Sequence, residues 1–423
     1  MNLYQSGQLH NRAMEIIPTG TQTFSKGRFL YPTGMPLYIE RGKGSHVWDV
    51  DGNEYIDFVS GLCPIILGYC DPDVDSAVKA QMESGVIFSL PHRLEIEVSE
   101  KLCEIIPCAE MVRFGKNGSD ATAGAVRLAR AYTGRDHIIT VAGHYHGWAD
   151  WYIGITARNA GVPQAIRELT HTFEYNDIDS LHALFRQYPN QVACVIMEPM
   201  SLTWPEDGFL EAVKELTHKN GAILIFDEVI TGLRMAMGGA QEYFGVIPDI
   251  ACFGKAIANG YPLSAVVGKS DIMSYFGKVH FSFTNGGECL SLAASKATLE
   301  KMERDSVVDA LKLSGAVIFR WFMDHTPVSY SGPPTGYKAQ EINISGYPAR
   351  TVINFPSDEM KWNFMRECAK RGILTIGCHN LMYSHTVEDI TKLLSVYDEV
   401  FPLIQDMKFN GYPPLSSFNI RWF

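Results

Sequence analysis

Short apolar runs alternate with amphipathic stretches through the middle of the chain. The run AILIF at 222–226 has no polar alternation, which is typical of a strand buried on both faces of a parallel sheet. Further strands are predicted at 111–114, 137–141, 193–197 and 249–253, and helices at 94–106 and 121–133. The pattern predicts an α/β domain with a doubly wound or similar parallel sheet and a site at the carboxyl ends of its strands.

The two ends of the chain follow a different pattern. A helix at 6–17 and a loop at 18–36 precede short strands at 36–40 and 46–50, and VWDVDGNEYIDF predicts a hairpin that turns at Asp51-Gly52. Helices at 358–371 and 387–403 alternate with strands near 349–354 and 373–375, which indicates a smaller lobe. We expect an N-terminal segment (1–60) that packs on the smaller lobe or on a partner chain, a large domain (61–305) and a small α+β domain (306–423).

Composition and charge narrow the class of protein. Of the 423 residues, 46% are hydrophobic and 20% are charged, ordinary values for a soluble globular chain. A formal net charge of −11 argues against a nucleic-acid partner. The nine cysteines are odd in number and form no C-x-x-C pair, so we expect free thiols in a reducing compartment. Neither a signal core nor an apolar run of ~20 residues occurs, so we expect a cytoplasmic protein with no membrane partner.

A glycine-containing loop, GKNGSD, lies between a predicted strand and a predicted helix. Asn117, Gly118 and Ser119 of this loop could approach an anion through backbone N–H groups at a helix start. The alternative is an ordinary turn in which Ser119 or Asp120 caps the helix. The loop is not a P-loop, because G-x-x-x-x-G-K-[ST] is absent.

Aromatic and imidazole side chains follow the next predicted strand. In His144-Tyr145-His146, the ring of Tyr145 could lie on a planar cofactor, although a plain core tyrosine is an equal alternative. No third ligand accompanies the two histidines nearby, so we expect no metal site.

An acid and a lysine follow two further strands. Asp227 directly follows AILIF, where a buried carboxylate needs a cationic partner such as a protonated ring nitrogen; a salt bridge or a magnesium ion is the alternative. Lys255 lies in a nearly uncharged, Gly-rich stretch that would favour the neutral, nucleophilic amine, although a surface lysine is possible. Thr284 adds a hydroxyl in a Gly-rich turn before a helix. Together these features supply what pyridoxal 5′-phosphate (PLP) requires of a protein.

The chain resembles the class III aminotransferases, and within them most closely the glutamate-1-semialdehyde 2,1-aminomutase family. The resemblance is strongest in WDVDGNEYIDFVSG, VRFGKNGSDATAGAVRLARAYTGRDHI, GHYHGWAD, LIFDEVITGLRMAMGGAQEYFGVIPD and FGKAIANGYPLSAVVG. It extends from about residue 36 to 300 and more loosely to the C-terminus. It implies the PLP-dependent transferase fold of aspartate aminotransferase type, with a mainly parallel sheet in the large domain.

The resemblance also implies a role for each matching position. Lys255 would hold PLP as a Schiff base and Asp227 would pair with the pyridine nitrogen. Tyr145 and Val229 would lie on opposite faces of the ring, while Glu198 would lie near it in a weaker role.

Phosphate binding would fall to Gly118 and Ser119, in a loop where Asn117-Gly118-Ser119-Asp120 replaces the family's usual Ser-Gly-Thr-Glu. Thr284 would reach the phosphate of a neighbouring subunit, so a homodimer with shared active sites is implied.

Three departures concern the substrate pocket. Gly61 and Leu62 stand where the aminomutases have Ser-Trp, WYIGITARNAGV at 151–162 replaces their Gly/Ser-rich gating loop, and GCHNLMYSHT near the C-terminus is shorter. We expect the chemistry at the PLP ring to be retained despite these changes, but not the substrate pocket of the aminomutases.

The hypothesis is therefore an aminotransferase that moves an amino group from a donor such as glutamate to an oxo-sugar or a small aldehyde or ketone. Pocket candidates are Trp151, Tyr152, Arg158, His379 and Asn380, each of which could equally be structural. The alternatives are the aminomutase reaction and a PLP-fold protein without catalysis. A Rossmann dehydrogenase is discarded, because no G-x-G-x-x-G follows a first strand.

Overall fold

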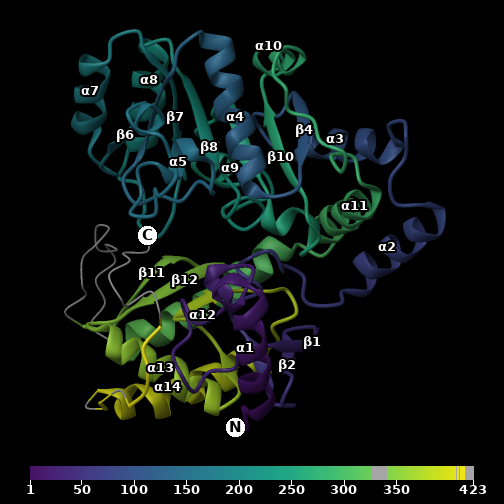
Figure 1. The fold of residues 1–423 in the computed structure, drawn as a ribbon, viewed down its shortest axis with the longest axis vertical. Coiled ribbons are helices and arrows are strands. Elements are labelled where there is room, and N and C mark those ends of the chain that lie inside the picture. The colour runs from purple at the N-terminus through teal and green to yellow at the C-terminus, as the bar shows by residue number, and fades with distance from the viewer. Residues whose placement is uncertain (326–340, 406, 409, 415–423) are drawn as a thin grey trace. The chain divides into compact units, whose positions relative to one another are not determined.

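The chain divides into two compact units in the computed structural model, which describes residues 1–325, 341–405, 407–408 and 410–414. The central unit is Pro72–Val308. The terminal unit combines Met1–Asp71 with the described part of Asp309–Trp422, and Figure 1 shows its purple N-terminal and yellow-green C-terminal elements side by side.

A seven-stranded sheet forms the centre of the central unit, in the order β4-β10-β9-β8-β7-β5-β6. Its strands are β4 (Met111–Gly115), β5 (His137–Val141), β6 (Thr170–Phe173), β7 (Val192–Met197), β8 (Ile223–Asp227), β9 (Ile250–Phe253) and β10 (Ser264–Gly268). Only β10 runs antiparallel to its neighbours, β4 and β9. The predicted mainly parallel sheet is confirmed, and β6 and β10 are the two strands that the pattern missed.

The helices of this unit connect the strands and cover the sheet (Figure 1). They are α2 (Pro72–Ser84), α3 (Arg93–Ile105), α4 (Gly118–Thr133), α5 (Asp150–Ile153), α6 (Gln164–Arg167), α7 (Ile178–Gln187), α8 (Phe209–Lys219), α9 (Ala240–Phe244), α10 (Ser270–Met273) and α11 (Cys289–Arg304). Helix α4 packs across β7–β10 through small residues such as Ala121 and Ala125, which let the helix approach the sheet closely. Every residue of β7 and β8 is buried, as the unbroken apolar runs predicted.

Two smaller sheets and four α-helices occur in the described part of the terminal unit. The sheets have the orders β1-β2-β3-β13 and β11-β12-β14. Their strands are β1 (Ile39–Lys43), β2 (His46–Asp49), β3 (Glu54–Asp57), β11 (Asn343–Tyr347), β12 (Arg350–Asn354), β13 (Ile373–Leu374) and β14 (Cys378–Asn380). The helices are α1 (Tyr4–Ile16), α12 (Val307–His325), α13 (Asp358–Lys370) and α14 (Val387–Ile404).

The predicted hairpin is confirmed, since β2 and β3 pair antiparallel around Asp51-Gly52. The first strand was predicted at 36–40 but lies three residues later, because its pairing with β2 continues to Lys43↔His46 across a turn at Gly44-Ser45. Arg41, which the prediction left outside a strand, lies with its guanidinium carbon 3.6 Å from the centre of the Trp48 ring.

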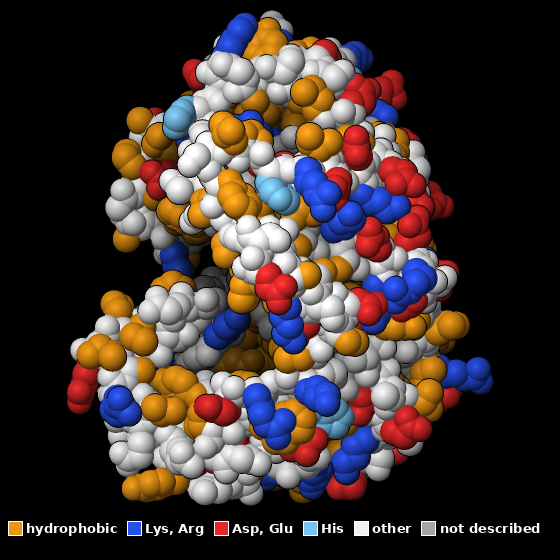
Figure 2. Space-filling view, turned by 90° about the vertical axis from the view of Figure 1, so that its right-hand side faces the viewer, with side chains coloured by type: hydrophobic (Ala, Val, Ile, Leu, Met, Phe, Trp, Pro, Cys, Tyr) orange, Lys and Arg blue, Asp and Glu red, His pale blue; other side chains and the backbone are white. Residues whose placement is uncertain are grey.

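The surface is mixed in charge. Figure 2 shows one face, on which acidic, basic and scattered hydrophobic side chains intermingle. None of the helices within the described ranges combines the length and the apolar character needed to cross a bilayer.

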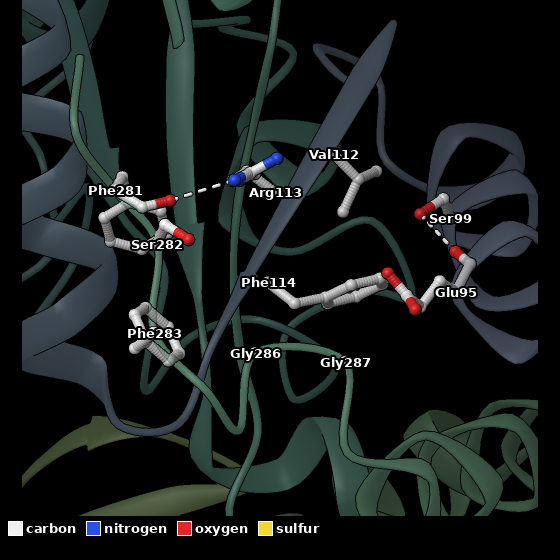
Figure 3. Close-up of a pocket in the computed structure, with 10 residues that line it drawn as sticks. All are labelled: Glu95, Ser99, Val112, Arg113, Phe114, Phe281, Ser282, Phe283, Gly286 and Gly287. Atoms are coloured by element: carbon white, nitrogen blue, oxygen red, sulfur yellow. Dashed lines mark hydrogen bonds between the residues drawn. The ribbon is translucent and has the colours of Figure 1, made fainter. Parts of the chain in front are cut away.

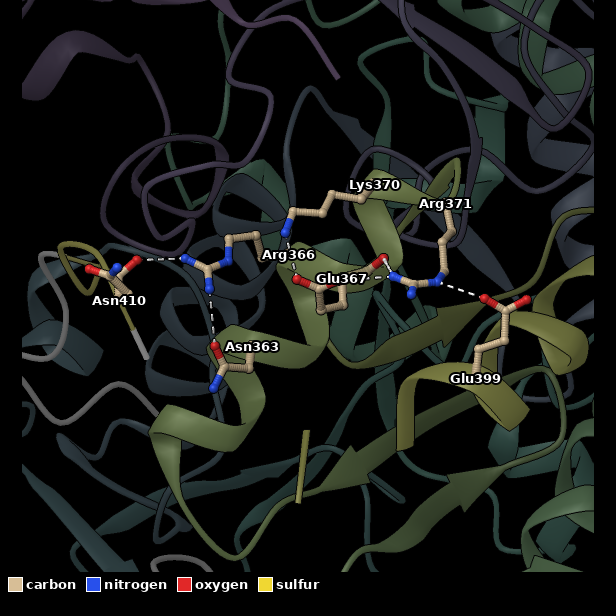
Figure 4. Close-up of polar contacts among 7 residues, drawn as sticks. All are labelled: Asn363, Arg366, Glu367, Lys370, Arg371, Glu399 and Asn410. Carbon is tan, nitrogen blue, oxygen red and sulfur yellow. Dashed lines mark hydrogen bonds and ion pairs between the residues drawn. The ribbon is translucent and has the colours of Figure 1, made fainter. Parts of the chain in front are cut away.

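A buried carboxylate joins α13 to α14 within the terminal unit (Figure 4). Glu367 is buried and accepts hydrogen bonds from Lys370 (2.7 Å) and Arg371 (2.9 Å), and Arg371 also donates to Glu399 of α14 (2.9 Å). Burial alone would raise the pKa of Glu367, but the bonds from Lys370 and Arg371 outweigh it and hold the pKa below its ordinary value.

We therefore expect Glu367→Gln to lower the free energy of unfolding by about 1–3 kcal/mol near neutral pH. Because the folded-state pKa is lowered, this stabilisation is present above the ordinary carboxyl pKa and disappears as the pH falls through the folded-state value. Urea unfolding between pH 7 and pH 3 measures the difference. Glu399→Gln is the control and should cost less than about 1 kcal/mol, since Glu399 is exposed. Equal losses for both variants at all pH values would contradict this account.

Candidate active site

The predicted cofactor residues other than Thr284 gather at one edge of the central sheet. Strands β4, β5, β7, β8 and β9 end at this edge, and each is followed by a loop that carries one or more of them. The carboxyl ends of strands that run in one direction meet at the same edge, so residues far apart in sequence come together there.

Helix α4 begins in the loop that was predicted to bind an anion. Asn117 is the N-cap, and it forms a capping box with Asp120. Gly118 and Ser119 are the first two helical residues, so their N–H groups have no partner within the helix and lie at the positive end of its dipole. The Ser119 hydroxyl accepts the N–H of Trp148 (3.2 Å), which leaves its own proton to be donated. The loop is thus a capped helix start whose N–H groups and hydroxyl are donors available to an anion, and we refer to it as the anion cradle.

Val229 packs between this cradle and the segment that carries Lys255. A Cβ atom added to Gly118 would lie 3.0 Å from a methyl group of Val229, and one added to Gly254 would lie 3.3 Å from the same methyl group. The two glycines therefore make room for the branched side chain. Lys255 directly follows Gly254, is half-buried and has φ = +43°, a left-handed conformation that costs a lysine energy and is typical of functional positions.

Asp227 is the last residue of β8 and is buried. One of its oxygens accepts the N–H of Val229 (3.1 Å), and the other lies 2.7 Å from Nδ1 of His146. The sequence pattern correctly indicated that this carboxylate needs a partner, but it did not identify His146. The signal that could have found it is a histidine in the loop after another strand that ends at the same edge.

Tyr145 lies between two buried histidines and is 44% exposed. Its ring meets that of Tyr152 edge-on, with centroids 5.7 Å apart. Burial, and then the charge of Asp227, raise the pKa of Tyr145. Tyr145 therefore remains a neutral aromatic surface that faces the open side of the loop.

Glu198 follows β7 and is buried, and its N–H donates to Nδ1 of His144 (3.2 Å). Thr284 lies instead in an exposed loop that ends at Glu288, and Glu288 pairs with Lys116 beside the anion cradle (3.1 Å). This loop borders a cavity of about 220 Å³ lined by Glu95, Ser99, Val112, Arg113, Phe114, Phe281, Ser282, Phe283, Gly286 and Gly287 (Figure 3).

The pocket candidates from the sequence differ in their surroundings. Trp151 and Tyr152 are part of the hydrophobic core of the central unit, and both rings also lie against that of His146. His379 is buried in the terminal unit, where it bonds to Thr351 (2.6 Å) and Tyr397 (2.6 Å). Asn380, also buried, donates to the carbonyl of Val59 (2.9 Å). These four side chains have structural contacts that account for their positions.

Comparison with known proteins identifies the family of the chain. The model of the family "Aminotransferase class-III" matches residues 31–392. The 3-aminobutyryl-CoA aminotransferase of Cloacimonas acidaminovorans is 35% identical over 96% of this chain and 99% of its own. The glutamate-1-semialdehyde 2,1-aminomutase of Natranaerobius thermophilus is 38% identical over 74% of this chain and 76% of its own.

Solved structures show the same fold. The FumI protein of Sphingopyxis sp. MTA144, in its PLP internal aldimine form, has a TM-score of 0.87 at 26% identity and covers 99% of both chains. An omega-transaminase from Sphaerobacter thermophilus has a TM-score of 0.86 at 27% identity and covers 96% of this chain and 100% of that one. The fold is that of the PLP-dependent transaminases, and the chain belongs to the class III aminotransferases, PLP-dependent enzymes that act on small molecules.

Proposed function

We propose that this enzyme transfers an amino group between two molecules, from a donor amino acid such as glutamate to a small aldehyde or ketone. The observation that carries the proposal is the packing of Val229 against Gly118 and Gly254, together with its bond to Asp227. It supports the proposal because the start of α4, a buried carboxylate and the lysine segment all adjoin one side chain. PLP requires these three elements together.

The residues at this edge fit PLP. Gly118 and Ser119 would hold its phosphate through N–H groups and a hydroxyl, beside the capping residue Asn117. Val229 and Tyr145 would cover the two faces of its ring, and a side chain at Gly118 would displace Val229 from that position. When bound, PLP supplies an aldehyde that captures amines and a ring that accepts the electron pair released at the reacting carbon.

The chain's own residues control protons around that ring. Asp227 would keep a proton on the ring nitrogen of bound PLP, because a buried carboxylate stabilises a cationic partner. His146 fixes the orientation of the Asp227 carboxylate from the side away from Val229. Lys255 would link to the aldehyde and, once displaced, its amine would carry a proton to and from the reacting carbon. Glu198 would border the same ring from the end of β7.

The relatives favour transfer between two molecules. The aminotransferase from C. acidaminovorans aligns over nearly the whole of both chains, and its name places the reacting amine on carbon 3 of an acyl group. This supports a small keto acceptor over the oxo-sugar that the sequence left open. Four aminomutases at 38–41% identity favour the second candidate, the intramolecular reaction, but they align over only 73–75% of this chain.

Two half-reactions test the proposal. We expect glutamate or another amino donor to bleach the PLP absorbance of the purified enzyme, and small ketones or aldehydes to restore it. Lys255→Ala should abolish turnover and leave the protein folded, whereas Lys219→Ala, at the end of α8, should behave as wild type. Turnover of glutamate-1-semialdehyde alone, with no restoration by any second carbonyl compound, would establish the aminomutase instead. Wild-type rates in Lys255→Ala would refute both.

The glycine at position 118 gives a second prediction. Gly118→Ala should weaken PLP binding by about tenfold, because the new methyl group and Val229 cannot both keep their places. Val229→Ala in the same chain should restore part of the loss. Gly277→Ala is the control, since nothing lies within 4 Å of its Cβ position. Equilibrium dialysis of apoenzyme with PLP measures the affinity. An unchanged dissociation constant in Gly118→Ala would contradict the proposed binding of PLP at the start of α4.

We further propose that two copies of the chain pair and share their active sites. An apolar surface on α2, α3 and the loop that joins them supports this pairing. Its exposed side chains are Met82, Phe88, Leu90 and Ile96. The cavity of Figure 3 opens beside α3 and the Thr284 loop. Exposed apolar patches of this kind mark protein interfaces. The resemblance assigns Thr284 to the neighbouring subunit's phosphate, so one copy would complete the cradle of the other.

Ile96→Asp should therefore convert a dimer into a monomer and also weaken PLP binding, because a buried charge at the contact is costly. Leu313→Asp is the matched control, since Leu313 is exposed on α12. Sedimentation velocity with and without PLP gives the mass. A monomeric wild-type enzyme with full activity, or a dimeric Ile96→Asp variant, would overturn this assignment.

A further inference from the structure

The segment between β5 and α5 alternates buried and exposed side chains. His144 and His146 are buried, whereas Tyr145 is 44% and Trp148 is 70% exposed. The two imidazoles therefore anchor the segment, and the ring between them faces the open side. Three contacts hold its second half: His146 lies against Asp227, Thr122 donates to the His146 carbonyl (2.7 Å), and the Trp148 N–H donates to Ser119.

His144 anchors the first half to a different strand. Its Nδ1 accepts the N–H of Glu198, the residue after β7, at 3.2 Å. Its carbonyl accepts the hydroxyl of Tyr152. Its ring lies 5.5 Å from that of Tyr175, whose hydroxyl donates to the carbonyl of Pro199 (2.7 Å). One imidazole thus joins the loop after β5 to the residues that follow β7.

The two histidines use Nδ1 in opposite ways. Nδ1 of His144 receives a backbone N–H and must carry a lone pair, so any proton on this ring is on Nε2. Nδ1 of His146 faces a carboxylate and donates to it. Burial, and then His146, lower the pKa of His144 to about 3, so its ring stays neutral and able to accept throughout the working range of an enzyme.

We propose that His144 is a positioning residue for the transamination reaction. Through its Nδ1 bond to Glu198, His144 sets the height of the Tyr145 ring over the cofactor. Tyr145 has one anchor on each side, to β7 through His144 and to β8 through His146. Adjacent Cα atoms are ~3.8 Å apart, so loss of either anchor moves the ring directly. The inference rests on the proposed stacking role of Tyr145.

The test compares His144→Leu, which removes the acceptor, with His144→Asn, whose side-chain oxygen can take the place of Nδ1. We expect His144→Leu to weaken PLP binding and to lower kcat, each by about tenfold, because the hydrogen bond that ties the loop after β5 to the backbone of Glu198 is lost. The KM for the amino donor should change less than about threefold. His144→Asn should recover most of both losses, and the circular dichroism of bound PLP should change in the leucine variant alone.

His171→Leu is the control, a half-buried histidine of β6 that bonds to His137 (2.7 Å) away from the site. It should leave PLP affinity and kcat at wild-type values. A leucine variant with unchanged PLP affinity, kcat and dichroism overturns the proposal, and so does an asparagine variant no better than leucine.

Tyr145→Ala separates the two levels of the argument. If Tyr145→Ala alters the dichroism of bound PLP while His144→Leu does not, only the role of His144 fails. If Tyr145→Ala leaves PLP affinity and dichroism unchanged, the stacking role fails and the inference falls with it.

Discussion

The carboxylate of Asp227 is the constraint around which the rest of the site is arranged. It ends a strand that is buried on both faces, where a negative charge is tolerated only if donors surround it. Val229 donates from one side and His146 lies on the other, so the oxygens are fixed by the end of β8 and by the loop after β5. The same two contacts place Val229 against Gly118 and Gly254 and orient the loop that carries Tyr145. The positions of the acid, the anion cradle and the segment of Lys255 therefore depend on the same contacts.

Much of this arrangement was predictable because the strongest signals are local. The unbroken AILIF run identified β8, the turn at Asp51-Gly52 identified the first hairpin, and both follow from side-chain burial and turn chemistry alone. Strand β10 was not predicted, and its place in the sheet depends on antiparallel pairing with β4 and β9, which forms only in the tertiary structure. The partnership of His146 with Asp227 was missed for a similar reason, since the two residues meet only after the sheet has formed.

Substrate choice is a different matter from cofactor chemistry. Apart from the phosphate loop at 117–120, where three of four residues differ from the family's usual ones, the residues that the resemblance assigns to PLP lie in matching sequence. The other departures fall in the loops at 61–64, 151–162 and near the C-terminus. Trp151 and Tyr152, which replace part of a gating loop, are core residues here. Substrate choice therefore has to be argued from the side chains of these loops and not from the fold that the family shares.

The construction of the terminal unit from both ends of the chain has a consequence for biosynthesis. Strand β3 pairs in parallel with β13. Ile56 therefore cannot pair until Ile373 has been synthesised, more than three hundred residues later. The central unit is complete by Val308 and can fold while translation continues, but the first sheet keeps an open edge until the last helices emerge from the ribosome. During that interval the backbone N–H and C=O groups along the free edge of β3 have no strand to pair with, and an uncovered edge of this kind is a template for pairing with another chain.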